Sequence, residues 1–131
     1  MKILILNGTH DRETSTSAHR STPMTATDIV HAITDTLNRK HSPRSSRLDN
    51  APLDYINTII TPEGGEIEID CDELQGLGIT RVVVCPTMKS NRGRVLYDVD
   101  CLVQLVGEVL GRPVALEELQ CCTYADPEFP S

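Results

Sequence analysis

Two runs of consecutive apolar residues stand out along the chain. Residues 2–6 contain Ile3-Leu4-Ile5-Leu6, and residues 79–85 end in Val82-Val83-Val84-Cys85. Neither series alternates with polar residues, and this pattern is typical of strands that are buried on both faces of a parallel sheet. We therefore predict one β-strand in each run.

Residues 24–39 show a helical period instead. Apolar side chains recur at every fourth position along one face: Ile29, Ile33 and Leu37. This spacing predicts an amphipathic helix with one apolar stripe. Thr25 and Asp28 stand where the two partners of a capping pair would lie at its beginning.

A longer helix is predicted over residues 93–110 and a short one over residues 72–77. The apolar stripe of the longer helix consists of Leu96, Val99, Val103, Val106 and Leu110. Gly111 occupies the position of a helix C-cap glycine, and Pro113 follows it as a stop. Residues 114–116 begin a last short strand.

Residues 55–70 have a different pattern. Two β-prone runs, residues 55–60 and 66–70, flank a segment with a proline and two consecutive glycines. Such a segment is typical of a turn, so we predict a β-hairpin. The second run alternates glutamate with isoleucine, which would place one face on the core and one in water.

Strands and helices alternate along the whole order, which is typical of an α/β domain with a parallel sheet. We predict a three-layer α/β sheet with helices on both faces and the hairpin as an insertion. The predicted domain covers residues 1–116, and residues 117–131 form a C-terminal tail. We expect the domain to be shortened at its C-terminus, and a sheet that lacks its last strand leaves an exposed edge. We therefore also predict a homodimer or larger assembly, with the tail or the hairpin at the contact.

Charge and composition narrow the range of partners. The 131 residues carry a net charge of −7 and few aromatic side chains, with no Trp, one Phe and three Tyr. Both properties argue against a nucleic-acid binder, which needs a basic face and stacking aromatics. No apolar run approaches the length of a membrane span, and the N-terminus does not look like a signal peptide. We therefore expect a cytoplasmic protein with no membrane contact.

The cysteines and a histidine motif suggest other chemistry. The five cysteines include no C-x-x-C pair, so we expect free thiols in a reducing compartment. Cys85 ends a strand and could serve as a nucleophile, but no acid–base partner is identifiable by spacing, so a buried structural cysteine is the favoured interpretation. His10 and Glu13 have the spacing of two metal ligands, but a third ligand is needed. The other histidines, His19, His31 and His41, have no diagnostic spacing, so a solvated loop histidine is favoured.

The strongest candidate site lies in the loops that follow the two apolar strands. In open α/β sheets, ligands bind beyond the carboxyl ends of the strands. If the two strands are neighbours, residues 7–18 and 86–93 would form the walls of one crevice, with a phosphate on amides and hydroxyls of the first loop. The candidate binding residues are Thr9, His10, Thr14, Ser15, Thr16, Ser17, Pro86, Thr87, Met88, Lys89, Ser90 and Asn91.

These loops resemble those of a known family. Asn7-Gly8-Thr9 followed by Thr16-Ser17-Ala18 is similar to the N-G-S-P-R-x-x-x-x-T/S-S phosphate loop of the flavodoxin-like NAD(P)H-dependent FMN reductases. Residues 82–87 resemble the strand before that family's P-x-Y-x-G-S flavin loop, and residues 111–116 resemble its G-K-P-V-A-L segment. The resemblance implies a three-layer flavodoxin-like fold with FMN, its phosphate on residues 9–18 and its ring against residues 86–91.

Two functions stay open. The first is an FMN- or nucleotide-binding protein in which NAD(P)H reduces the flavin, as the resemblance implies. The second is a non-catalytic regulatory or protein-interaction module that binds a small nucleotide or a partner protein through the same crevice. Asp11 and Glu13 stand where the family has basic residues, and these two negative charges near the proposed phosphate favour the second function.

Overall fold

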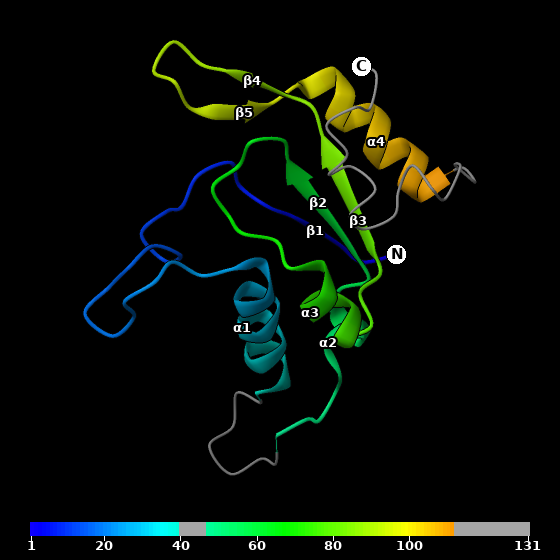
Figure 1. Ribbon diagram of the computed structural model, residues 1–131. Helices are drawn as coiled ribbons and strands as arrows, with labels where there is room; N and C mark the ends of the chain where they lie inside the picture. The colour runs from blue at the N-terminus through cyan, green and yellow to red at the C-terminus, as the bar shows by residue number, and fades with distance from the viewer. Residues whose placement is uncertain (40–46, 112–131) are drawn as a thin grey trace.

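The computed structural model describes residues 1–39 and 47–111 (Figure 1). Strands and helices alternate along most of this part of the chain. The elements in chain order are β1 (Ile3–Ile5), α1 (Ala26–Asn38), α2 (Pro52–Tyr55), β2 (Thr58–Pro62), α3 (Cys71–Gly76), β3 (Arg81–Cys85), β4 (Thr87–Lys89), β5 (Val95–Tyr97) and α4 (Val99–Gly111). The predicted α/β class is therefore confirmed.

The main sheet has three strands in the order β1-β2-β3, and both pairings are parallel. The register aligns Leu4 with Ile59 and Ile59 with Val82. All five residues of the central strand β2 are buried. The consecutive valines of β3 suit a strand in a sheet that is covered on both faces.

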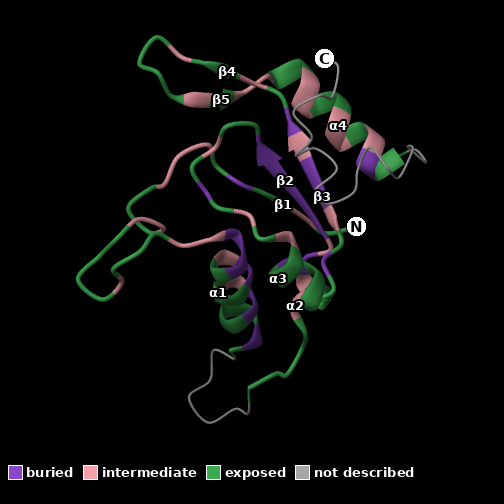
Figure 2. Ribbon diagram, in the orientation of Figure 1, coloured by how far each residue is buried: buried purple, intermediate pink, exposed green. Residues whose placement is uncertain are grey.

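Two hydrophobic clusters pack on the two faces of the sheet. On one face, Ile59 and Val82 belong to a cluster with Val30 of α1 and Leu74 of α3. On the other face, Ile60 and Val83 belong to a cluster with Val109 of α4. The view coloured by burial shows purple on β2, on β3 and along one side of α1, and mostly pink and green on α4 (Figure 2). The helices therefore divide between the two faces.

The predicted capping pair forms at the beginning of α1. The Thr25 hydroxyl accepts the Asp28 amide at 3.2 Å, and the Asp28 carboxylate accepts the Thr25 amide at 2.9 Å. These two bonds satisfy backbone donors that the first turn of a helix leaves without partners. The helix begins at Ala26, two residues after the start of the predicted range.

The hairpin predicted over residues 55–70 is wrong. Thr58–Pro62 is instead the central parallel strand β2, and residues 66–70 form no strand. Their backbone bonds go to other segments: the Glu66 amide donates to the Gly8 carbonyl, and the Glu68 carbonyl accepts the Ala26 amide. Ile67 is buried in the same cluster as α1 and α3. The alternation of glutamate and isoleucine thus reflects an extended segment packed on the core, not a paired strand.

A hairpin does form, at a place where the sequence predicted a loop and the start of a helix. Strands β4 and β5 pair in antiparallel fashion, with Met88 opposite Leu96. Gly93 turns the chain with a φ of +75°, a conformation that favours glycine. The predicted helix over residues 93–110 therefore begins only at Val99. The apolar residues Val95 and Leu96 fit the helical period equally well, so the period alone could not place the boundary.

Two further predictions meet different outcomes. The last strand at residues 114–116 and the tail at residues 117–131 lie outside the described residues. Cys85 and Cys101 carry free thiols as predicted, whereas Cys71 is disulfide-bonded, so the prediction of free thiols is wrong for Cys71. Within residues 1–39 and 47–111, no helix is long and apolar enough to cross a membrane.

Candidate functional site

The carboxyl ends of β1 and β3 are not neighbours, because β2 lies between these strands. The crevice predicted between residues 7–18 and 86–93 depended on adjacent strands, and that condition is not met. The two regions meet instead through β5, which returns across the edge of the sheet. A Cβ atom at Gly8 would lie 2.3 Å from the Val95 carbonyl oxygen. Glycine is therefore the residue that permits this close approach.

Tyr97 anchors the base of the β4–β5 hairpin. Its hydroxyl donates to the Leu6 carbonyl at 2.5 Å and lies 3.2 Å from the Ile60 carbonyl. Burial raises the pKa of Tyr97 well above its ordinary value of 10.0, so the hydroxyl keeps its proton. The Thr87 hydroxyl donates to the Glu63 carbonyl at 2.8 Å. The hairpin is thus hydrogen-bonded to the ends of β1 and β2.

The loop after β1 is organised around the carboxylate of Asp11. One carboxylate oxygen accepts the amides of Glu13 and Thr14, each at 2.9 Å, and the Thr14 hydroxyl at 3.1 Å. The amide of Thr14 is the largest cause that lowers the pKa of Asp11 below 3.8. The His10 amide donates to the Glu66 carboxylate at 3.0 Å. Amides that the sequence suggested for a phosphate therefore hold two carboxylates of the protein itself.

Other predicted phosphate contacts also have partners within the loop. The His10 ring nitrogen Nδ1 lies 3.0 Å from the Thr14 hydroxyl. The Ser15 amide donates to the Asp11 carbonyl, and the Ser17 backbone pairs with that of Arg20. Aspartate and serine side chains commonly close such turns by bonding to amides two or three residues later. The turn brings His10 and Thr14 together, and Glu66 joins it to the rest of the fold.

The predicted flavin-contacting residues lie on the hairpin and face several directions. Met88 is 53% exposed and stands opposite Leu96, which is 46% exposed. Thr87 is bonded to Glu63, and Ser90 lies in the turn at the tip. Within the described residues, no hydrogen bond joins residues 9–17 to residues 86–91. The FMN site stays a prediction, and the hydrogen bonds do not assemble its two halves.

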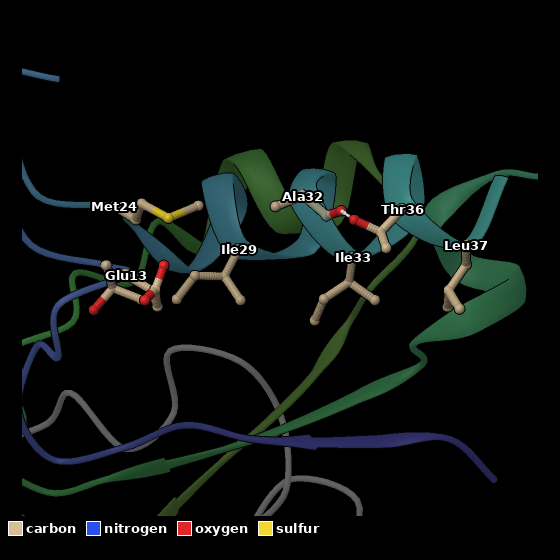
Figure 3. Close-up of a pocket in the computed structure, with 8 residues that line it drawn as sticks. Glu13, Met24, Ile29, Ala32, Ile33, Thr36 and Leu37 are labelled. Carbon is tan, nitrogen blue, oxygen red and sulfur yellow. Dashed lines mark hydrogen bonds between the residues drawn. The ribbon is translucent and has the colours of Figure 1, made fainter. Parts of the chain in front are cut away.

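The described part of the chain has a concave site beside α1. We call it the α1 groove. It has a volume of about 360 Å³ and is lined by Glu13, Thr14, Met24, Ile29, Ala32, Ile33, Thr36 and Leu37. The apolar side chains follow one side of the helix, and Glu13 lies at the end near Met24 (Figure 3). Its signal in the sequence was the stripe of apolar residues Ile29, Ile33 and Leu37 on α1.

The other catalytic candidates find little support. Burial raises the pKa of the Cys85 thiol to about 11, with the neighbouring Cys101 as a second cause. A reactive cysteine needs the opposite shift, so the favoured interpretation of a buried structural cysteine is consistent with the fold. His10 and Glu13 do not gain a third ligand: in the described part of the chain, no group of three side chains could hold a metal ion.

Comparisons with protein families, with curated proteins and with solved structures find no match to this chain. The similarity to FMN reductases is therefore limited to the short motifs in the sequence. The function has to be argued from the geometry of the α/β domain and its surfaces.

Proposed function

We propose that this chain is a non-catalytic protein-interaction module whose α1 groove takes an apolar helical segment of a partner protein. One observation carries the proposal: five of the eight residues that line the groove are apolar, and Leu37 among them is 51% exposed. A contiguous exposed apolar surface in a protein often marks a binding groove or an interaction site. Apolar side chains of a partner in the groove would remove this apolar surface from water.

The spacing of the lining residues favours a helix as the occupant. Ile29, Ile33 and Leu37 follow one another at four-residue intervals, so they form a ridge about 12 Å long at 1.5 Å per residue. Apolar side chains at three- or four-residue intervals on a partner helix would pack beside such a ridge. Met24 closes one end, and its flexible side chain suits a surface that adapts to a ligand.

The polar groups of the groove argue against a nucleotide inside it. None of the eight lining residues is basic, and Glu13 brings a negative charge. The Thr36 hydroxyl already donates to the Ala32 carbonyl at 2.8 Å. A phosphate would therefore meet repulsion in the groove, whereas an apolar helix would not.

The parallel sheet favours a second candidate function, the binding of FMN or another nucleotide at the carboxyl edge. Three parallel strands direct their following loops to one edge, which is where ligands bind in open α/β sheets. In a flavodoxin-like protein, NAD(P)H would be the co-substrate of a bound FMN. The Asp11 carboxylate would have to leave the Glu13 and Thr14 amides for a phosphate to take its place.

The first experiment places a photo-crosslinking amino acid at Thr36, an exposed position in the groove, and at Leu53, a 42% exposed position on α2. In cells that express the full chain, we expect a discrete crosslinked protein from Thr36 and none of the same mass from Leu53. Leu37→Asp should abolish this product, because a charge in the groove opposes apolar packing. Leu48→Asp, at a 42% exposed leucine outside the groove lining, is the matched control.

The proposal fails if Thr36 gives no product, or if Leu37→Asp and Leu48→Asp reduce it equally. A titration of FMN against the purified chain tests the second candidate separately. Saturable quenching of FMN fluorescence that Thr16→Asp abolishes would establish flavin binding at the loop after β1. Unchanged fluorescence would remove the FMN prediction and leave the interaction proposal to its own test.

A further inference from the structure

The β4–β5 hairpin carries a surface whose chemistry is opposite to that of the rest of the protein. We propose that this hairpin is an arm that binds an acidic, extended peptide segment of a partner protein along the outer edge of β4. This inference goes beyond the α1 groove and does not depend on it. It rests on the charge, the backbone order and the free edge of the hairpin.

Three cations gather at the tip of the hairpin. Lys89, Arg92 and Arg94 are exposed, and no acidic residue occurs between positions 86 and 97. The ion pairs in the described part of the chain join other residues, Arg12 with Glu13 and Arg47 with Asp35. Among the described residues, the three positive charges of the tip have no carboxylate partner, on a chain whose net charge is −7.

The backbone that carries these cations is held in place. The Ser90 hydroxyl accepts the amides of Arg92 at 3.3 Å and Arg94 at 3.2 Å. The Ser90 amide donates to the Arg94 carbonyl, and the Gly93 amide donates to the Ser90 carbonyl, each at 2.9 Å. A turn that is ordered before binding loses less conformational entropy when a ligand arrives.

The two edges of the hairpin differ. The outer edge of β5 faces the end of β1, since the Val95 carbonyl lies against Gly8. Strand β4 pairs with β5 alone in the described residues, so its outer edge has backbone groups available for another strand. The hairpin projects away from the main sheet, with β4 along its outer side (Figure 1). Addition of an extended peptide to such an edge is a common form of recognition.

An apolar pair lies beside the charges. Met88 and Leu96 stand directly opposite each other on one face of the hairpin, and both are about half exposed. A bound strand would present alternate side chains to the two faces. A peptide in which acidic and apolar residues alternate could therefore contact the cations and the apolar pair together.

A nucleic acid fits this surface less well. Its phosphates would be attracted to the tip, but the −7 net charge of the chain would repel a longer polyanion. Base stacking needs exposed aromatic side chains, and Tyr97 of the hairpin has its hydroxyl bonded to the ends of β1 and β2. An acidic peptide is short, and its apolar residues have a contact in Met88 and Leu96.

The test measures fluorescence anisotropy of a labelled peptide of about ten residues, in which Glu and Val alternate, against the full chain. We expect saturable binding that weakens as the salt concentration rises. The same peptide with Lys in place of Glu should not bind. Arg92→Glu with Arg94→Glu should weaken binding about tenfold or more, because two attractive contacts become repulsive. Arg92→Gln with Arg94→Gln should weaken it by a smaller factor.

Lys2→Glu with Arg39→Glu is the matched control, since it changes the net charge equally at exposed positions outside the hairpin and outside the loop that meets it. This pair should leave the affinity within about twofold. Equal weakening by the two pairs would show that only the net charge matters and would overturn the proposal. Absence of saturable binding to the Glu–Val peptide would also overturn it, as would tighter binding of a single-stranded oligonucleotide in the same buffer.

Discussion

The loop after β1 and the hairpin after β3 meet at one edge of the sheet, but their charged side chains differ in whether they have bonding partners. In the loop, the Asp11 carboxylate accepts two amides and a hydroxyl of its own turn. In the hairpin, Lys89, Arg92 and Arg94 have no carboxylate partner in the residues described. The loop pairs the Glu13 and Thr14 amides with its own carboxylate, whereas the cations of the hairpin have no such partner among the described residues.

This difference reverses the roles that the sequence suggested. The hydroxyl-rich loop was predicted to hold an anion, and residues 86–91 were predicted to contact an uncharged ring. In the structure, a carboxylate occupies the amides of the loop, and the positive charge gathers on the hairpin. The number of hydrogen-bond donors in a loop therefore does not establish an anion site, because acceptors of the same loop can occupy them.

The largest expected effect comes from the contact between the two regions. Gly8→Ala would place a Cβ atom 2.3 Å from the Val95 carbonyl oxygen, and this backbone clash should cost about 2–3 kcal/mol in the free energy of unfolding. Chemical denaturation measures the change. Gly76→Ala is the control, because a Cβ there meets no atom within 4 Å. Equal stability of the two variants would show that the hairpin does not rest on the loop.

A smaller effect is expected from the hydroxyl of Tyr97. Tyr97→Phe leaves the Leu6 and Ile60 carbonyls without this donor and should cost about 1–2 kcal/mol. Hydrogen exchange should show faster opening of residues 87–97. Tyr55→Phe removes a hydroxyl that donates to Asn38 at the other end of the sheet. It should lower stability without changing exchange in the hairpin, and a similar exchange pattern in both variants would contradict this.

The smallest effect is confined to the loop after β1. Its hydrogen bonds lower the pKa of Asp11 below 3.8. The ionised carboxylate therefore stabilises the turn above pH 3.8, and this contribution is lost as the pH falls through the lowered pKa. Asp11→Ala should remove the exchange protection of the Glu13 and Thr14 amides at neutral pH. Asp49→Ala, an exposed aspartate elsewhere, should leave that protection unchanged.

The same variant sharpens the comparison with a phosphate site. If the loop can hold FMN, Asp11→Ala should strengthen FMN binding, because it frees two amides and removes a negative charge. If protection of the Glu13 and Thr14 amides survives in Asp11→Ala, the carboxylate does not organise the turn. In that case the Asp11 carboxylate would not explain why the loop after β1 differs from the hairpin.

Several features of the fold could be predicted because they depend on local chemistry. The strand at Ile3–Ile5 lies within the predicted residues 2–6, and α1 lies within residues 24–39. The capping pair of Thr25 and Asp28 forms as predicted. The turn of Asp11 and Thr14 is also local, and an aspartate three residues before a threonine was a signal that could have revealed it.

The features that the sequence predicted wrongly depend on contacts between residues that are distant in the chain. Residues 66–70 have the alternation of a strand, but the amide of Glu66 bonds to Gly8 and the carbonyl of Glu68 to Ala26. Val95 has the period of a helix, yet it pairs with Lys89 and lies against Gly8. Such partners are invisible in a local pattern. The α1 groove was missed for the same reason, since exposure of Leu37 depends on what the rest of the fold leaves uncovered.

The sequence by itself determined where β1, β3 and α1 form, because apolar runs, helical periods and caps act within a few residues of one another. It also determined the α/β class through their alternation. Only the tertiary structure decided that β2 separates β1 from β3, that the hairpin belongs to residues 87–97, and which charges form ion pairs within residues 1–39 and 47–111. These properties arise from pairing and burial between distant segments, and the function proposed for the groove and the hairpin depends on them.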